Sequence, residues 1–203
     1  SGNMTRRDFE EYAADLQEAL SLLGTNLERA ADLVQSFKKV AVDRTTEDMR
    51  DFNLKEYLND ILMSLKPRYK KTGHQIAVEC PDNISLKSYP GTFSQIVTNL
   101  VMNSLIHGFD GIEHGEISIT VSRTGENITM IYSDNGVGIP RENLEKIFEP
   151  FFTTRRSSGG TGLGLNITMN LITRNLGGNI ICESEPGKGT RFIITFPSEA
   201  PAA

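Results

Sequence analysis

The segment Asn99-Leu100-Val101-Met102-Asn103-Ser104-Leu105-Ile106-His107 is apolar except for a few polar side chains, two of which are amides four residues apart. On a helix, two such amides project from the same face. A buried amide needs hydrogen-bond partners, so a satisfied pair of core asparagines is one interpretation. The other is a cation site, because an amide oxygen is a hard ligand suited to Mg²⁺, which takes few protein ligands. His107, one turn further along, could donate to a phosphate or cap the helix end.

Patterns on both sides of this segment predict an α+β fold. Apolar alternation and turn residues predict strands at 75–80, 85–89, 116–122, 127–133, 179–184 and 190–196. Helical periodicity and capping residues predict helices at 53–70, 90–107, 141–147 and 162–175. These elements predict a layer of helices over a mixed sheet, which is a two-layer α/β sandwich.

The N-terminal part predicts a long helix of the coiled-coil type that precedes this sandwich. Apolar residues alternate there at intervals of four and three, at Leu16, Leu20, Leu23, Leu27, Ala30, Val34, Phe37 and Ala41. Such a stripe packs on a second chain, on another helix or on its own domain. The charged, Thr-rich segment Asp43–Asp51 breaks the pattern. We therefore expect two domains, at residues 1–44 and 51–198.

The composition and net charge of the chain limit the kinds of molecule that it is expected to bind. The 203 residues carry a formal net charge of −5, which disfavours broad nucleic-acid binding because that relies on clustered Lys and Arg. Cys80 and Cys182 lie in apolar, strand-like surroundings, so we expect buried thiols in a reducing compartment. No run approaches the roughly 20 apolar residues of a membrane span, and we expect no membrane contact by this segment.

A second stretch, Asp134-Asn135-Gly136-Val137-Gly138-Ile139-Pro140, follows a predicted strand. Its carboxylate can accept from an exocyclic amine, while the glycines let the backbone pass close to a flat base. The alternative is an ordinary loop between a strand and a helix, since many such loops use this turn.

A third stretch, Gly159-Gly160-Thr161-Gly162-Leu163-Gly164-Leu165, precedes a predicted helix. The first amides of a helix have no partners within it and bind anions. The polar, basic segment Thr153–Ser158 before it is typical of a lid over phosphates, or of a plain mobile loop. No Gly-Lys-Ser/Thr follows, so this is not a Walker loop. A fourth stretch, Gly187–Thr190, would in isolation be a hairpin turn.

Taken in this order and spacing, the stretches resemble the N, G1, F, G2 and G3 boxes of histidine kinase catalytic domains. These domains share a superfamily, and an ATP site called the Bergerat fold, with gyrase, Hsp90 and MutL. The N box is at 99–107, the G1 box at 134–138, the F box at 148–152 and the G2 box at 160–165.

This resemblance implies a site for ATP and Mg²⁺. By it, Asp134 would bind the adenine amine near Thr190. Asn103 and Asn99 would hold the metal and the phosphates, and Arg155 or Arg156 would touch the γ-phosphate. The implied site residues are Asn99, Asn103, His107, Asp134, Gly136, Gly138, Ile139, Phe152, Arg155, Arg156, Gly160, Thr161, Gly162, Leu163, Gly164, Leu165 and Thr190.

The resemblance also implies a reaction class. Gyrase-like and Hsp90-like ATPases place a glutamate at the position of Asn99 to activate water, whereas asparagine suits transfer to another acceptor. The Leu16–Ala41 helix looks like the second helix of a dimerisation and phosphotransfer hairpin. The resemblance thus implies a homodimeric, cytoplasmic histidine kinase that phosphorylates a response-regulator receiver domain, and whose parent could be membrane-anchored upstream.

One departure concerns the phosphate acceptor. None of the three histidines, His74, His107 and His114, has the acidic and Asn/Thr-Pro context of an acceptor histidine. This implies an acceptor helix outside this chain, or a natural adaptor, so we expect little autophosphorylation by the chain alone. The alternatives are a degenerate partner-recruiting module and a superfamily serine kinase of the anti-sigma type.

Overall fold

The computed structural model describes residues 49–70, 72–154 and 160–201, together with residues 12, 15–17, 20–21, 23–24 and 26–27. Contacts divide the chain into two units, Ser1–Arg44 and Thr45–Ala203. The described residues of the first unit are helical. The rest of the predicted coiled-coil seam, including Ala30, Val34, Phe37 and Ala41, lies outside the described residues. Within the described part of the chain, no helix is long and apolar enough to cross a bilayer.

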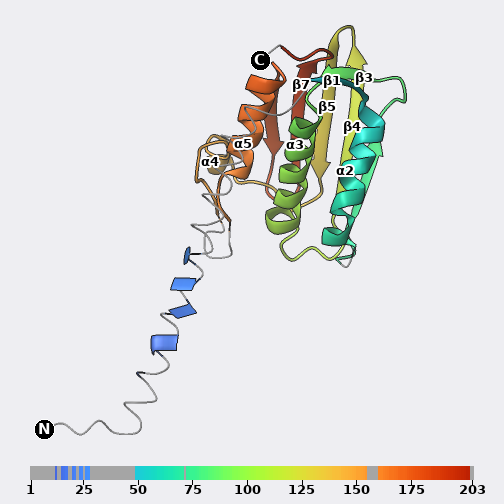
Figure 1. Ribbon diagram of the computed structural model, residues 1–203. Helices are drawn as coiled ribbons and strands as arrows, with labels where there is room; N and C mark the ends of the chain where they lie inside the picture. The colour runs from blue at the N-terminus through green and yellow to red at the C-terminus, as the bar shows by residue number, and fades with distance from the viewer. Residues whose placement is uncertain are drawn as a thin grey trace, which may run out of the picture. The chain divides into compact units, whose positions relative to one another are not determined.

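The second unit contains a five-stranded mixed sheet in the order β2-β4-β5-β7-β6 (Figure 1). The strands are β2 Gln75–Glu79, β4 Glu116–Thr124, β5 Asn127–Asp134, β6 Asn179–Ser184 and β7 Thr190–Pro197. β2 pairs with β4 in parallel, and the other pairs are antiparallel. Every second residue of β5, namely Ile128, Met130 and Tyr132, is buried, as alternation along a strand requires.

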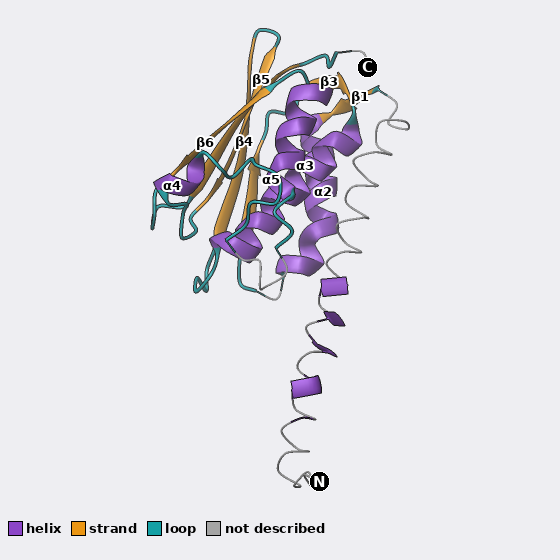
Figure 2. Ribbon diagram, turned by 90° about the vertical axis from the view of Figure 1, so that its left-hand side faces the viewer, coloured by secondary structure: helices purple, strands orange, loops and turns teal. Residues whose placement is uncertain are grey.

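Helices α2 Leu54–Tyr69, α3 Pro90–Asn103 and α5 Gly164–Asn170 cover one face of this sheet (Figure 2). The short helix α4 Arg141–Leu144 lies apart from them, beside β6. π-helical turns follow α3 at Ser104–Gly108 (η1) and α5 at Leu171–Asn175 (η3). Buried side chains of α3, among them Phe93, Ile96 and Val97, join the sheet in one hydrophobic core. The predicted two-layer α+β sandwich with a mixed sheet is therefore confirmed.

The entry into α2 follows its sequence signal. The side chain of Asn53 accepts a hydrogen bond from the backbone N–H of Glu56 at 3.0 Å, which caps the helix. Strand β1 (Arg50–Asn53) precedes it and pairs with β3 (Ser85–Ser88) in a separate two-stranded sheet. We did not predict β1, because Arg50–Asn53 lacks an alternating apolar pattern and its pairing with β3 is a long-range event.

Two segments that the sequence predicts as single helices are α-helical in their first part and π-helical at their end. The segment predicted as one helix from Pro90 to about His107 is α-helical to Asn103 and π-helical from Ser104. The backbone N–H of Phe109 donates to Ser104 O, five residues earlier, at 2.8 Å, which is the hydrogen bond of a π-helical turn. The predicted helix at 162–175 likewise begins at Gly164 and ends in η3. Apolar periodicity does not reveal a single wider turn, and such turns are frequent at functional sites.

Candidate functional site

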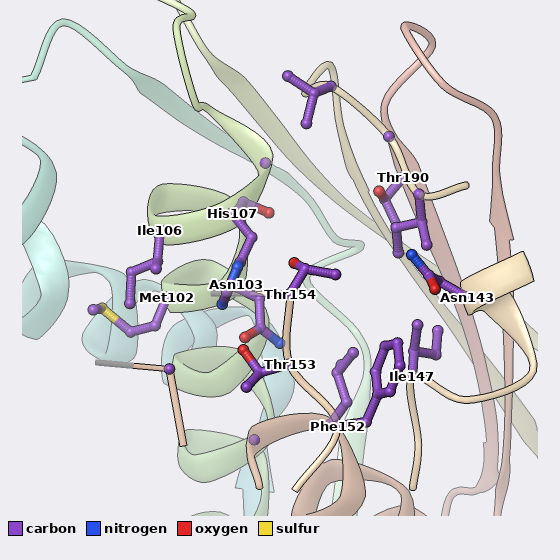
Figure 3. A pocket seen from close by; sticks show the side chains of 18 of the residues that line it. Met102, Asn103, Ile106, His107, Asn143, Ile147, Phe152, Thr153, Thr154 and Thr190 are labelled. Carbon is purple, nitrogen blue, oxygen red and sulfur yellow. The ribbon is translucent and has the colours of Figure 1, made fainter. Parts of the chain in front are cut away.

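A pocket of about 670 Å³ lies beside α3 and η1, within the range of small-molecule sites. Met102, Asn103 and His107 lie along one wall, and Thr190 and Asn143 lie on the opposite side (Figure 3). Many of the predicted site residues line it: Asn99, Asn103, His107, Asp134, Gly138, Ile139, Phe152, Gly160, Thr161, Gly162, Gly164, Leu165 and Thr190.

Four predicted residues are not among those that line the pocket. Gly136 lies in the loop after Asp134, and its backbone N–H donates to Asp134 Oδ1 at 3.0 Å. Leu163 is buried immediately before α5. Arg155 and Arg156 lie outside the described residues.

Asp134, at the end of β5, is held by three donors from within the protein. Its Oδ1 accepts from the backbone N–H groups of Gly136 and Thr190, at 3.0 and 3.1 Å. Its Oδ2 accepts from Ser104 Oγ at 2.6 Å. Only 9% of Asp134 is exposed. Since a carboxylate offers about four acceptor positions, these bonds leave one for a ligand and fix the carboxylate plane.

Ser104 connects this carboxylate to the core. Tyr132 Oη lies 2.8 Å from Ser104 Oγ and 3.1 Å from Leu100 O. Burial raises the pKa of the Tyr132 phenol well above its ordinary value, which keeps the phenol protonated as a donor. Ser104 is itself buried at the first position of η1. The α-to-π transition therefore presents a hydroxyl to Asp134.

The loop after Asp134 is enclosed by other backbone segments. A Cβ at Gly136 would lie 2.5 Å from Gly108 O, and one at Gly138, where φ is +73°, would clash with the Glu185 carbonyl. The Val137 N–H donates to Gly108 O at 2.8 Å. The missing side chains at these two glycines therefore let the neighbouring chain segments pack closely against this loop. The sequence alone predicted a different reason for the glycines, namely the close approach of a flat base.

Asn103 presents the opposite situation to Asp134. Its Nδ2 is buried and has no hydrogen-bond partner among the residues that the structure describes, although the residue lines the pocket. A buried donor without a partner is unfavourable by about 1–3 kcal/mol. The Oδ1 of the same amide is a hard ligand of the kind that Mg²⁺ takes, and a phosphate oxygen would be an acceptor for Nδ2. The Asn103 amide therefore fits a magnesium–phosphate ligand.

Asn99 is engaged on both sides by the protein. Its Nδ2 donates to Gly164 O at 3.1 Å and to Thr168 Oγ1 at 3.3 Å. Its Oδ1 accepts from Gln95 Nε2 at 2.9 Å. The two amides that look equivalent in sequence thus lie in different environments.

Several lining residues are not among the predicted site residues. Apolar or hydroxyl side chains complete the walls at Met102, Ser104, Ile106, Val137, Ile147, Thr153, Thr154 and Phe192. Met102, Ser104 and Ile106 lie within the segment that carries Asn99 and Asn103. Their position on that predicted helix was the sequence feature that could have placed them in the pocket. Ser104 was missed because its partner Asp134 is 30 residues away.

The two cysteines differ in environment. Cys80 is buried and Cys182 is half-buried. Burial, followed by the nearby Asp134 and Glu183 carboxylates, raises the pKa of Cys182 to about 12. Its thiol is therefore protonated at neutral pH and lacks the thiolate that reactive cysteines need.

Comparisons with known proteins agree on one family. Residues 89–200 match the model of the family described as histidine kinase-, DNA gyrase B-, and HSP90-like ATPase. The chain is 31% identical over 197 residues to the sensor histidine kinase RcsC of Salmonella typhimurium, across 94% of this chain and 20% of RcsC. The chain thus spans about a fifth of the length of that relative.

Two solved structures are similar in fold. The catalytic domain of histidine kinase ThkA is 29% identical, with a TM-score of 0.65 over 75% of this chain and 97% of that domain. ThkA in complex with the response regulator protein TrrA gives a TM-score of 0.70 at 24% identity, over 90% of this chain and 51% of that chain. At that identity, the second likeness bears on fold alone.

Proposed function

Because the chain belongs to the histidine kinase-, DNA gyrase B- and HSP90-like ATPase family and carries the catalytic ATPase domain of a sensor histidine kinase, we propose that its pocket binds ATP with Mg²⁺ for phosphoryl transfer to a histidine outside this chain. The Asp134 carboxylate carries the proposal. It is buried, lines the pocket and keeps one acceptor position after three internal hydrogen bonds. That position suits the exocyclic amine of adenine, because an ionised carboxylate accepts and cannot donate.

The remaining site residues surround the rest of the nucleotide in this proposal. Thr190, Gly138 and Ile139 would lie around the base, and Phe152 would anchor the base of the lid. His107 and the stretch Gly160–Leu165 would face the phosphates, and Arg155 or Arg156 would touch the γ-phosphate.

Asn103 would hold Mg²⁺ through Oδ1 and a phosphate oxygen through Nδ2. The unpartnered state of Nδ2 supports this assignment. Bound Mg²⁺ would neutralise charge that builds up on the phosphates during transfer. The contribution of the chain itself is to orient the nucleotide and to exclude water from it.

For the parent protein, the proposed reaction exchanges one phosphorus bond for another. A nitrogen of the acceptor imidazole forms a bond to the γ-phosphorus, the bond to the bridging oxygen breaks, ADP leaves, and the imidazole proton passes to solvent. Residues 1–44 would be part of the dimerisation hairpin of a cytoplasmic homodimer, and residues 51–198 the catalytic domain. A response-regulator receiver domain would then take the phosphoryl group, as the resemblance to sensor histidine kinases implies.

Calorimetric titration of the full chain tests the nucleotide site. With Mg²⁺ and a non-hydrolysable ATP analogue we expect saturable binding at one site. Binding of the matched guanosine analogue should be at least about tenfold weaker, because its base presents an oxygen where adenine presents an amine. Absence of binding, or equal affinity for both bases, would contradict the proposal.

A second experiment tests the absence of an acceptor. After incubation with labelled ATP and Mg²⁺, we expect no acid-labile phosphohistidine on this chain. Label on His74, His107 or His114 would show that the acceptor lies within the chain and would overturn this part of the proposal.

A further inference from the structure

A polar contact joins α3 to α5 within the helical layer. Asn99, on α3, donates through Nδ2 to the carbonyl oxygen of Gly164 and to the hydroxyl of Thr168, both on α5. One turn earlier on α3, Gln95 donates through Nε2 to Asn99 Oδ1 at 2.9 Å. This chain of bonds is called the α3–α5 clasp below, and its side chains are Gln95, Asn99 and Thr168.

The chemistry of the partners fixes the orientation of the Asn99 amide. A backbone carbonyl can only accept, so the Asn99 atom 3.1 Å from Gly164 O must be the nitrogen. The amide oxygen then points to Gln95, whose NH₂ group is the matching donor. If the amide were turned over, two oxygens would face each other at Gly164.

Thr168 completes the contact. Its side chain is fully buried, and its Oγ1 donates to Gly164 O at 2.9 Å while accepting from Asn99 Nδ2. The Gly164 carbonyl thus receives two side-chain donors at the residue where α5 begins. Gly164 and Leu165 line the pocket, and Asn103 lies beside Gly164, whose added Cβ would be 3.7 Å from Asn103 Oδ1.

We propose that Gln95 is a positioning residue of the nucleotide site, which acts through Asn99 to hold α5 against α3. The Gln95 bond takes one of the two acceptor positions of Asn99 Oδ1 and fixes the direction in which that oxygen points. Asn103 is then the amide of α3 that is left to turn toward a metal. The clasp also sets the position of Gly164 and Leu165 relative to Asn103. This inference rests on the proposed nucleotide site for its functional consequence, whereas the amide orientation stands independently of it.

Substitutions at Gln95 test the direction of the hydrogen bond. Gln95→Met keeps length and loses the donor, whereas Gln95→Glu keeps the shape more closely but offers only acceptors. We expect affinity for Mg²⁺ and the non-hydrolysable ATP analogue to fall about fivefold in Gln95→Met and about twentyfold in Gln95→Glu. A role in packing alone predicts the reverse order, so Gln95→Glu binding as well as or better than Gln95→Met would overturn the proposal.

Thr168 provides a matched pair that keeps the proposal testable if the Gln95 variants do not fold. Thr168→Val fits the buried site but lacks the hydroxyl, and Thr168→Ser restores it. We expect an affinity loss of about threefold to tenfold for Val, with at least partial recovery for Ser. Equal affinities for Val and wild type would contradict the clasp.

A measurement without nucleotide separates failure of the clasp from failure of the proposed function. In ¹⁵N-labelled chain, the side-chain amide protons of Asn99 should exchange slowly with solvent and show contacts to Thr168. In Gln95→Glu this protection should be lost. If the protection is present but wild-type chain ignores nucleotide, the proposed function fails and the clasp stands. If Asn99 is unprotected in wild type, the clasp fails whatever the nucleotide result.

Discussion

The two ends of the pocket differ in how complete they are without a ligand. At the base end, Asp134 already accepts three hydrogen bonds, from Ser104, Gly136 and Thr190. At the amide end, Asn103 buries a donor that has no partner within the described part of the chain. The first arrangement is preorganised, so a ligand adds one bond to a fixed acceptor. The second is unfavourable until a ligand completes it. The Asp134 end therefore recognises the ligand with a fixed acceptor. At the Asn103 end, ligand binding stabilises the protein because it gives the buried donor a partner.

The largest effect should come from breaking the preorganised end. Asp134→Ala removes the acceptor and leaves the N–H groups of Gly136 and Thr190 without their partner. We expect nucleotide affinity to fall about 100-fold and the free energy of unfolding to fall by about 1–3 kcal/mol. Calorimetry and denaturant unfolding measure the two effects. Unchanged affinity would show that the base is read elsewhere.

The incomplete end should respond differently. Asn103→Ala removes the proposed metal ligand together with the unpartnered donor. We expect affinity for the Mg²⁺ nucleotide to fall about 30-fold, while the free energy of unfolding without nucleotide changes by less than about 0.5 kcal/mol or rises. Thermal melting with and without Mg²⁺ nucleotide measures both. A strongly destabilised free protein would mean that Asn103 has a structural role that its contacts do not show.

A smaller effect should follow from loosening Asp134 without removing it. Ser104→Ala deletes one of its three donors, and we expect a loss of about fivefold in affinity, equivalent to about 1 kcal/mol. Tyr132→Phe is the control, because its hydroxyl touches Ser104 but not the carboxylate. It should reduce the affinity less than Ser104→Ala does. The opposite order would place the critical contact at Tyr132.

The smallest effect concerns His74, which packs next to η1 near the Asp134 end of the pocket. His74 Nδ1 accepts from the Gly115 N–H at 2.9 Å, and its ring packs on Phe109, which follows η1. Burial, and secondarily His114, lowers the pKa of His74 below 6.5. Since the unfolded chain then binds the proton more readily, this stability is present above pH 6.5 and is lost as pH falls below it.

Replacement of His74 should therefore weaken the pH dependence. In His74→Asn we expect the free energy of unfolding to fall less steeply below pH 6.5 than in wild type. Unfolding series at several pH values measure the slope, with His114→Asn as the control for the exposed neighbour. An unchanged slope in His74→Asn would assign the dependence to other groups.

Features of the site that depend on neighbouring residues in the sequence could be predicted, whereas contacts between distant segments could not. The spacing of Asn99 and Asn103 and the turn after Asp134 are local properties, so the sequence indicated the fold and most of the pocket wall. The resemblance to histidine kinase catalytic domains is confirmed by the family match together with the similarity to RcsC and to the ThkA catalytic domain. The unequal roles of the two amides could not be predicted, because Thr168 reaches Asn99 only once α5 packs on α3.

Long-range contacts and helix irregularities account for the rest. The bond from Ser104 to Asp134 depends on η1, where one wider turn changes which side chains face the sheet. Strand β1 forms only through pairing with β3, and its own residues carry no alternation. Both features arise from tertiary packing, which local periodicity does not encode.

A crystal structure of the full chain with Mg²⁺ and a non-hydrolysable ATP analogue would place the nucleotide in the pocket or outside it. We expect the adenine amine within hydrogen-bond distance of Asp134 and the metal about 2.1 Å from Asn103 Oδ1, with Asn99 still bonded to Gly164 O. A nucleotide bound outside this pocket, or an adenine amine that meets a group other than Asp134, would contradict this expectation.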